Sequence, residues 1–184
     1  MTGRARSPKR NAAAVVAGAV RGALSGMAGT AAMDLIQYGR YRAGGGDQPF
    51  AEYEFRGVSD WDHAPAPAQA GRLFAKTFFG MYLPDDKANP VNNFMHWSYG
   101  IAWGTAAGAL AAATGQRSAR WGPVFGTTVW LSDYITLPLL HLYEPIWRYD
   151  PKTLARDWAD HVVYGAATGA ALQLLGGPRP THTP

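Results

Sequence analysis

Two short stretches of this sequence, HWSYGIAWG at 96–104 and HVVYGAATG at 161–169, share the pattern H-x-x-Y-G-x-x-x-G. The match extends one helical turn further back, where Asn92 precedes the first stretch and Asp157 precedes the second. Each stretch opens an apolar run, so each predicts the start of a helix. A motif written twice in this way predicts an internal repeat, in which two helical hairpins lie in the same orientation.

Four segments have the length and apolar character of transmembrane helices, since the core of a bilayer needs about 20 residues of helix. They are 12–38, 94–115, 121–143 and 151–177, the last of which starts as a polar helix and becomes apolar at His161. The mean hydropathy of −0.18 is that of a soluble protein, but it hides an uneven distribution of charge. Charged residues are concentrated in the N-terminal tail, in 40–87 and in 144–160. The sequence therefore predicts an all-α, polytopic bundle of four transmembrane helices.

Glycines at four-residue spacing occur in all four predicted spans. They are Gly18, Gly22, Gly26, Gly100, Gly104, Gly108, Gly122, Gly126, Gly165 and Gly169. In water, a glycine inside a helix costs about 1 kcal/mol relative to alanine. In lipid, the same G-x-x-x-G spacing lets two helix backbones approach closely, and helix association depends on it. The pattern favours a membrane bundle over a soluble helical domain, whose helices would carry charge along one face.

The distribution of basic residues predicts the orientation of the chain in the membrane. The tail 1–11 and the loop 116–120 contain Lys and Arg without any acid, whereas the loops 39–93 and 144–150 carry acidic residues. Short basic loops stay in the cytoplasm. We therefore expect a plasma-membrane protein with both termini, including the tail 178–184, on the cytoplasmic side.

The long outer loop contains a predicted amphipathic helix at 66–81. Its apolar positions at helical spacing are Ala70, Leu73, Phe74, Phe78 and Met81, with Arg72 and Lys76 on another face. Such a helix lies in the membrane interface with its aromatic side in the headgroup region. The alternative is a lid that packs on the mouth of the bundle with the same residues.

Ionisable and phenolic side chains gather in the outer halves of the predicted spans. They are Asp34, His96, Tyr99, Asp133, Asp157, His161 and Tyr164. An ionisable residue within a span costs roughly 2.5–3.5 kcal/mol at the helix centre, so it normally has a partner. In the repeat, His96 is the natural partner of Asp34, and His161 is the natural partner of Asp133. We expect one Asp–His pair in each hairpin.

Three interpretations of this Asp/His/Tyr cluster remain open. The first is structural, with hydrogen bonds that only hold the helices in register. The second is a path or site for protons or a cation, because histidine titrates near neutral pH and carboxylates beside it can relay protons. The third is a metal-dependent membrane enzyme, because nitrogen and oxygen ligands suit zinc, manganese or iron.

The remaining motifs narrow the classes of function. No H-E-x-x-H, G-x-S-x-G or phosphate-binding glycine loop is present, so a non-enzymatic role is favoured and no catalytic residue is assigned. The chain has no cysteine, which excludes disulfides and thiol chemistry. Its basic residues are scattered, so nucleic acid is not an expected partner. No cofactor is expected; the expected partners are the lipid bilayer and either a second copy or another membrane protein.

The stretches NNFMHWSYGIAWG and LYEPIWRYDPKTLARDWADHVVYG also carry a family resemblance. The chain resembles an uncharacterised family of actinobacterial multi-pass membrane proteins over residues 61–175. It is similar, more distantly, to the YagU-like inner-membrane proteins in the layout of its spans and its histidine-led helices. The resemblance implies a multi-pass plasma-membrane protein. It implies no chemistry and no catalytic residues.

Overall fold

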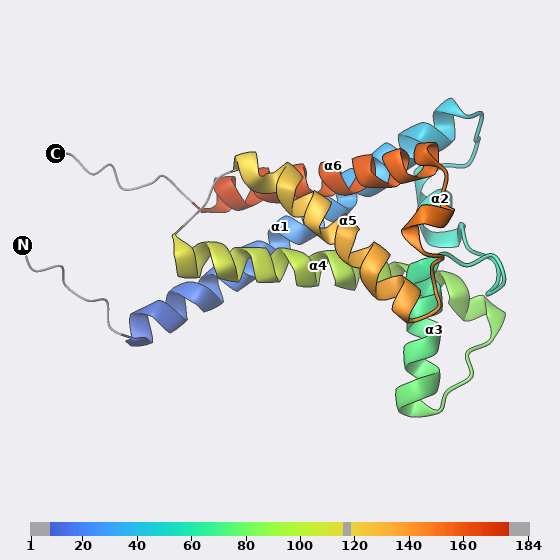
Figure 1. The fold of residues 1–184 in the computed structure, drawn as a ribbon, viewed down its shortest axis with the longest axis horizontal. Helices are drawn as coiled ribbons and strands as arrows, with labels where there is room; N and C mark the ends of the chain where they lie inside the picture. Colours follow the sequence, from blue (N-terminus) through green and yellow to red (C-terminus); the bar gives the residue numbers. More distant parts are fainter. Residues whose placement is uncertain (1–7, 116–118, 177–184) are drawn as a thin grey trace, which may run out of the picture.

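The computed structural model describes residues 8–115 and 119–176, and these residues are almost entirely helical. Four long helices run along the molecule (Figure 1). They are α1 (Pro8–Ala43), α4 (Ala88–Thr114), α5 (Gly122–Leu139) and α6 (Pro151–Leu175). Within the described residues there is no strand, so the predicted all-α class is confirmed.

Shorter elements occupy the connections between the long helices. The connection from α1 to α4 holds α2 (Phe50–Arg56) and α3 (Ala66–Phe79), and 3₁₀ turns occur at Asp85–Lys87, Ala119–Trp121 and Ile146–Arg148. The start of α1, the end of α4, the start of α5 and the end of α6 lie at one end of the bundle, here called the terminal end (Figure 1). The opposite end carries α2 and α3 and is called the α2/α3 end.

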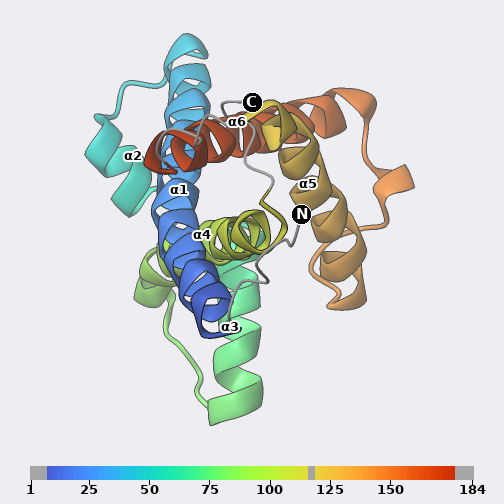
Figure 2. The ribbon, with the colours of Figure 1, turned by 90° about the vertical axis from the view of Figure 1, so that its left-hand side faces the viewer.

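The long helices form two antiparallel hairpins, α1 with α4 and α5 with α6. The hairpins are joined mainly through α1 and α6, so the order across the bundle is α4–α1–α6–α5. Figure 2, which faces the terminal end, shows α5 standing apart from α4. Among the described helices, α4 and α5 form no extensive interface with each other.

Every glycine in the predicted packing set lies where two helix backbones approach within one hairpin. In the first hairpin, Gly18, Gly22 and Gly26 of α1 face Gly108, Gly104 and Gly100 of α4. In the second hairpin, Gly122 and Gly126 of α5 face Gly165, Gly169 and the backbone of His161 in α6. A Cβ atom on Gly22 or Gly165 would overlap a carbonyl oxygen of the facing helix. Close approach of this kind requires glycine.

The ends of the helices follow local sequence signals. The Asp150 side chain accepts hydrogen bonds from the backbone nitrogens of Lys152 and Thr153, and Pro151 occupies the first turn, so α6 begins with a cap. Gly115 ends α4 with a φ of 75°. Helix α5 ends at Leu139, earlier than the predicted 143, because Pro138 sits in its last turn and His141 has a φ of 56°.

Other boundaries also differ from the predicted ones. Helix α1 continues to Ala43 instead of 38, and α4 begins at Ala88 instead of 94. The extra turns of α1 carry Arg40, which forms an ion pair with the buried Asp160 of α6. The predicted tail 178–184, the first seven residues of the tail 1–11, and residues 116–118 of the predicted loop lie outside the described residues.

The predicted amphipathic helix is α3, which ends at Phe79, two residues before the predicted end. Its small residues Ala68, Gly71 and Ala75 are buried, and Gly71 lies against Val91 and Met95 of α4. Its aromatic residues are exposed; they are Phe74, Phe78 and Phe79. The helix is therefore docked on the bundle through its small face, and its aromatic face is left uncovered.

One of the described helices, α1, is long and apolar enough to cross a membrane, over Ala12–Ala43. The helices α4, α5 and α6, which contain the other predicted spans, are not apolar enough over a membrane-spanning length to meet the same criterion. Their sequences are diluted by Trp, Tyr, His, Thr and Gly, and α6 begins with a charged first half. The structure thus gives a helical protein with one candidate membrane span among its described helices.

Candidate functional site

A cavity of about 550 Å³ lies at the α2/α3 end of the bundle. Its walls come from α1, α2, α3, α4, α5 and α6, so residues far apart in the sequence meet there. All seven residues of the predicted cluster line it: Asp34, His96, Tyr99, Asp133, Asp157, His161 and Tyr164. The repeated motif therefore contributes both of its histidines and both of its tyrosines to one cavity.

The first Asp–His pair connects α1 to α4. The Nε2 atom of His96 lies 2.8 Å from Oδ1 of Asp34, within the range of a hydrogen bond. Asp34 is only 3% exposed, whereas 27% of the His96 side chain is accessible. The second carboxylate oxygen of Asp34, Oδ2, is buried and has no hydrogen-bond partner among the described residues.

The second Asp–His pair connects α5 to α6 and is more completely bonded. The Nε2 atom of His161 lies 3.1 Å from Oδ2 of Asp133, and the Tyr99 hydroxyl donates to Oδ1 at 2.6 Å. The Nδ1 atom of His161 lies 2.8 Å from the carbonyl oxygen of Asp157. Both oxygens of Asp133 and both ring nitrogens of His161 thus have partners.

The bonds of His161 imply a shared proton. A carbonyl oxygen can only accept, so Nδ1 donates to Asp157. The partner of Nε2 is a carboxylate oxygen of Asp133, so a hydrogen bond there needs a second proton. Either His161 carries both ring protons or Asp133 holds one. In both cases the second pair retains one more proton than a neutral imidazole beside an ionised carboxylate.

The two tyrosines of the repeated motif cross from one hairpin to the other. Tyr99 of α4 donates to Asp133 of α5, as described above, and Tyr164 of α6 donates to the carbonyl oxygen of Gly100 in α4 at 2.6 Å. Asp157 accepts from Trp130 Nε1 at 3.1 Å. The symmetry of the sequence is therefore broken in the bonding, because Tyr164 bonds to backbone where Tyr99 bonds to a carboxylate.

Sequence reasoning missed the contribution of α2 and of the first turns of α4. Tyr53, Glu54 and the α4 residues Asn89, Asn92 and Asn93 also line the cavity. The asparagines hold α2 in place: Asn93 donates to the carbonyl oxygen of Glu54 at 2.8 Å, and Asn89 donates to that of Phe55. The run NPVNN at 89–93 was the available signal, since asparagine is rare inside a helix unless its amide has a partner.

The cavity is acidic. Asp34, Glu54, Asp133 and Asp157 contribute four carboxylates, and no Lys or Arg is found among its described lining residues. Glu54 accepts from Trp97 Nε1 at 3.2 Å, and burial together with the nearby Asp34 carboxylate raises its pKa. No group of three or more His, Asp or Glu in the described part of the chain is arranged to hold a metal ion.

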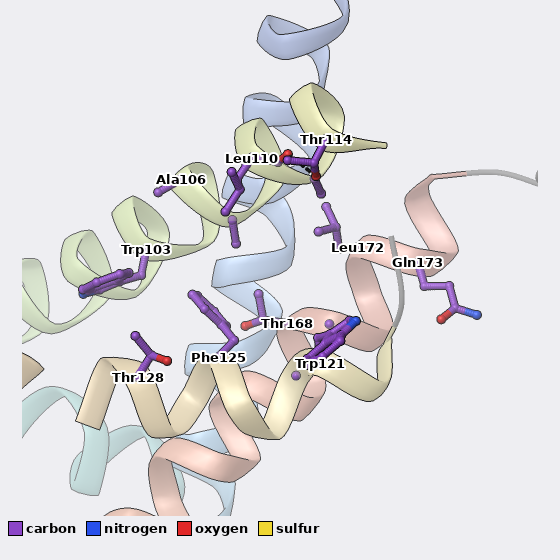
Figure 3. A pocket seen from close by; sticks show the side chains of 14 residues that line it. Trp103, Ala106, Leu110, Thr114, Trp121, Phe125, Thr128, Thr168, Leu172 and Gln173 are labelled. Carbon is purple, nitrogen blue, oxygen red and sulfur yellow. Dashed lines mark hydrogen bonds between the residues drawn. The ribbon is translucent and has the colours of Figure 1, made fainter. Parts of the chain in front are cut away.

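An aromatic layer separates this cavity from the rest of the bundle. The ring of Trp103 lies 6.2 Å from those of Tyr99 and Phe125, and Phe125 lies 5.8 Å from Tyr164. Beyond this layer, a second cavity of about 470 Å³ lies between α4, α5 and α6 (Figure 3). Its walls are mainly apolar, with Trp103, Leu110, Phe125 and Leu172 pointing into the space where α4 and α5 diverge.

The comparisons with known proteins add no further assignment. The chain matches no family model, no curated protein sequence and no solved structure. The geometry of the cavity is therefore the basis for assigning a function.

Proposed function

We propose that this protein is a four-span integral membrane protein that takes up protons or a cation from the outer side of the plasma membrane. The site of uptake is the acidic cavity at the α2/α3 end. One observation carries the proposal: Asp34 is 3% exposed, yet its Oδ2 atom lacks a hydrogen-bond partner among the described residues. A buried carboxylate oxygen without a partner is costly, and a proton or cation at Oδ2 removes this cost.

The distribution of side chains supports insertion of all four long helices in a membrane. On α1, the polar Ser25 and Thr30 are buried, whereas Val16 and Val20 are 64% and 58% exposed. The other long helices repeat this arrangement, with glycine inside and large apolar residues outside; the latter include Leu110, Val124, Ile135 and Leu174. A soluble bundle buries its large apolar side chains instead. Lipid is the solvent that suits this surface.

Aromatic clusters support the placement of the α2/α3 end at a membrane interface. On the first hairpin, Tyr38 lies 5.2 Å from Phe50 and 5.4 Å from Tyr53, between ring centroids. On the second, Tyr134 lies 5.4 Å from both Tyr143 and Tyr149. Tyrosine and tryptophan are enriched where a membrane meets water. The exposed phenylalanines of α3 fit the same interface, and the basic loops predicted at the opposite end favour a cytoplasmic location for that end.

The proton or cation is taken up at the outer face, in the cavity at the α2/α3 end. Below the aromatic layer, the lining of the second cavity carries Thr and Gln but no charged group among its described residues. An ion would pay a high desolvation cost there. The cavity at the α2/α3 end is therefore the part of the bundle in which a charge can be held.

A structural role is the second candidate, and the pair Asp133–His161 favours it. Both side chains have their hydrogen bonds satisfied within the protein, and Tyr99 ties this pair to the other hairpin. Such a network fixes the positions of helices. The metal-enzyme interpretation has no comparable support, because a set of three ligands is not found among the described residues.

The membrane topology is tested by labelling with a thiol reagent, since the chain has no cysteine of its own. Single substitutions Ser59→Cys, in the predicted outer loop, and Ser118→Cys, in the predicted inner loop, serve as reporters. We expect an impermeant maleimide to label Ser59→Cys in intact cells and Ser118→Cys only after permeabilisation. Extraction of the protein by alkaline carbonate without detergent would contradict membrane insertion.

Uptake at Asp34 is tested by following the histidine ring signals of the purified protein by NMR as a function of pH. A cation at Asp34 Oδ2 competes with a proton on His96, so sodium, potassium or ammonium chloride should move the His96 titration to lower pH. The exposed His63 reports general screening by salt. In Asp34→Asn the cation dependence of His96 should disappear.

Two outcomes would overturn the proposal. In the first outcome, no cation shifts the His96 titration more than it shifts the His63 titration, and Asp34→Asn leaves the His96 titration unchanged. The other is a cation effect of equal size in Asp34→Asn, because it would then arise elsewhere in the protein.

A further inference from the structure

We infer that the ligand of the acidic cavity is a small organic amine in its protonated form, held through N–H donors at Asp34 and Asn92. This inference rests on the proposed function and names the class of cation that the site takes up. It is independent of any passage through the bundle.

The size of the cavity favours an organic ligand over an inorganic ion. Its volume of about 550 Å³ falls within the range of roughly 300–1,000 Å³ that is usual for small-molecule sites. A metal ion needs several ligands within about 2.0–2.6 Å. The described residues offer no cluster of three His, Asp or Glu for this purpose. A ligand that fills the cavity therefore has a molecular body as well as a charge.

The unsatisfied polar atoms of the cavity are acceptors. Asp34 Oδ2 and Asn92 Oδ1 are both buried, and neither has a partner among the described residues. The amide nitrogen of Asn92 donates to Asn93 Oδ1 at 3.3 Å, which directs its oxygen away from that contact. Both residues line the cavity. A protonated primary amine supplies three donors at one nitrogen, as the lysine side chain does.

The charge of the lining selects a cation, and its aromatic residues suit an organic one. Besides the proton-retaining Asp133–His161 pair, three carboxyl groups line the cavity, without Lys or Arg among the described lining residues, which disfavours an anion. The lining also includes Tyr53, Tyr99, Tyr143 and Tyr164. Aromatic rings attract ammonium groups and pack against carbon. Carboxylates with tyrosines therefore match a ligand that has both an ammonium group and an apolar part.

The two parts of such a ligand have separate places in the cavity. The ammonium group is placed by Asp34 of α1 and by Asn92 of α4. On the other side, the apolar lining residues Val129 and Leu137 belong to α5, and Leu140 directly follows its end. Helix α2, held by Asn89 and Asn93, forms part of the wall through Tyr53 and Glu54. A ligand whose ammonium group contacts α1 and α4 and whose carbon skeleton contacts α5 matches the polarity of each wall.

Binding of three matched probes to the purified full-length protein in detergent tests the inference by equilibrium dialysis. Benzylamine has the charge and the N–H donors, benzyltrimethylammonium has the charge without the donors, and benzyl alcohol has neither the charge nor the ammonium donors. We expect benzylamine to bind at least about tenfold more tightly than either of the other two, because a hydrogen bond to a charged group is lost in each case.

Variants locate the binding. Asp34→Asn, which keeps an oxygen for His96, should weaken benzylamine at least about tenfold, and Asn92→Leu should weaken it by a smaller factor. Asp60→Asn changes a partly exposed carboxylate outside the cavity and should leave binding unchanged. It also corrects for partition of the probe into micelles. If Asp34→Asn fails to fold, Asn92→Leu and the ranking of the three probes still decide the question.

Several results would overturn the inference. Equal binding of benzylamine to wild type, Asp34→Asn and Asn92→Leu would place it elsewhere, and equal binding of benzyltrimethylammonium would show that N–H donors play no part. No binding of any probe, together with a His96 titration that still responds to sodium or potassium, would leave the proposed function intact and reject the amine. No response in either experiment would reject both.

Discussion

The two Asp–His pairs of this bundle arise from the same repeated motif but are bonded differently. In the second hairpin, Asp133 uses both of its oxygens, one for His161 and one for Tyr99. In the first hairpin, Asp34 uses one oxygen for His96, and the other has no partner among the described residues. The difference teaches that the two copies of a repeat can be completed differently: one carboxylate has both oxygens bonded within the protein, and the other keeps one buried oxygen without a partner among the described residues.

The tyrosines explain how the symmetry is lost. Tyr99 of the first motif reaches Asp133 of the second hairpin, but its counterpart Tyr164 bonds to the carbonyl oxygen of Gly100 and leaves Asp34 without a phenol. A polar residue with all its bonds made stabilises the fold, whereas one with a missing bond reduces stability until a ligand supplies it. The predictions below separate these two roles.

The largest expected effect comes from removing the carboxylate of the satisfied pair. Asp133→Leu leaves the mostly buried His161 and the Tyr99 hydroxyl without their partner, so we expect a loss of about 4 kcal/mol in the free energy of unfolding. Asp34→Leu removes one bond to the partly accessible His96 and also removes the unpartnered oxygen, so its loss should be about 1 kcal/mol. Unfolding by SDS in mixed micelles measures both.

Asp133→Asn is the control for this comparison. Its amide can donate to a neutral His161 and accept from Tyr99, so its loss should be well below that of the leucine variant. Equal losses for Asp133→Leu and Asp34→Leu would show that the two pairs contribute equally to the stability of the fold.

A second prediction compares equivalent glycines of the two hairpins. A Cβ atom at Gly104 would lie 2.6 Å from the Cα atom of Gly26, whereas one at Gly169 would lie 3.2 Å from the Cα atom of Gly122. Backbone atoms cannot yield easily, so Gly104→Ala should cost about 3 kcal/mol, and Gly169→Ala about 1 kcal/mol or less. The same SDS unfolding assay gives the values. A larger loss for Gly169→Ala would reverse the order of tightness that the structure gives to the two hairpins.

A third prediction concerns the two crossing tyrosines. Tyr99→Phe removes a donor from the carboxylate of Asp133, and Tyr164→Phe removes a donor from a backbone carbonyl. Because bonds to charged acceptors are stronger, the losses should be about 2 and about 1 kcal/mol, respectively. Tyr99→Phe should also shift the pH dependence of the His161 ring signal, and Tyr164→Phe should not. A His161 titration that is the same in both variants would contradict the assignment of Tyr99 to this pair.

The smallest effect is expected from Glu54 of α2, which lies beside the open pair. Burial and Asp34 raise its pKa above the ordinary 4.5. The folded state therefore binds its proton more tightly than the unfolded state, and the contribution of Glu54 to stability falls as the pH rises from about 4.5 through the raised folded pKa. Glu54→Gln should protect the α2 backbone amides against hydrogen exchange relative to wild type at pH 7, with a smaller difference at pH 4.

Glu52 supplies the matched control, since it lies on the same helix and is exposed. Glu52→Gln should leave the pH dependence of exchange in α2 as it is in wild type. A response of the same size in both variants would assign the effect to the charge of the helix as a whole.

Much of the architecture could be predicted because its determinants are local in the sequence. The glycine spacing indicated close helix pairs, and the repeated H-x-x-Y-G-x-x-x-G motif indicated two equivalent hairpins. Asp34–His96 and Asp133–His161 follow from these, since antiparallel helices of one hairpin bring their outer halves together. The distances of 2.8 and 3.1 Å between their atoms agree with that expectation.

The rest depends on contacts between distant segments. Helix α2 is short and charged, and it keeps its place through asparagine bonds from α4 that no local pattern indicates. The extension of α1 to Ala43 brings Arg40 to the buried Asp160, a residue far away in the chain. The unequal roles of Tyr99 and Tyr164 depend on how the hairpins are placed against each other. Hydropathy also gave too uniform a picture, because among the described helices only α1 is long and apolar enough by itself to cross a membrane.

The divergence of α4 and α5 has a mechanical consequence. The hairpins meet mainly along α1 and α6, so these two helices form the centre of the bundle and α4 and α5 are its outer members. On the α4 side, two phenol hydroxyls, those of Tyr99 and Tyr164, tie the first hairpin to the second. A movement of α5 away from α4 therefore breaks the Tyr99 bond to Asp133 and the contact between the rings of Trp103 and Phe125. The position of α5 is thus linked directly to a hydroxyl group that lies on the wall of the cavity.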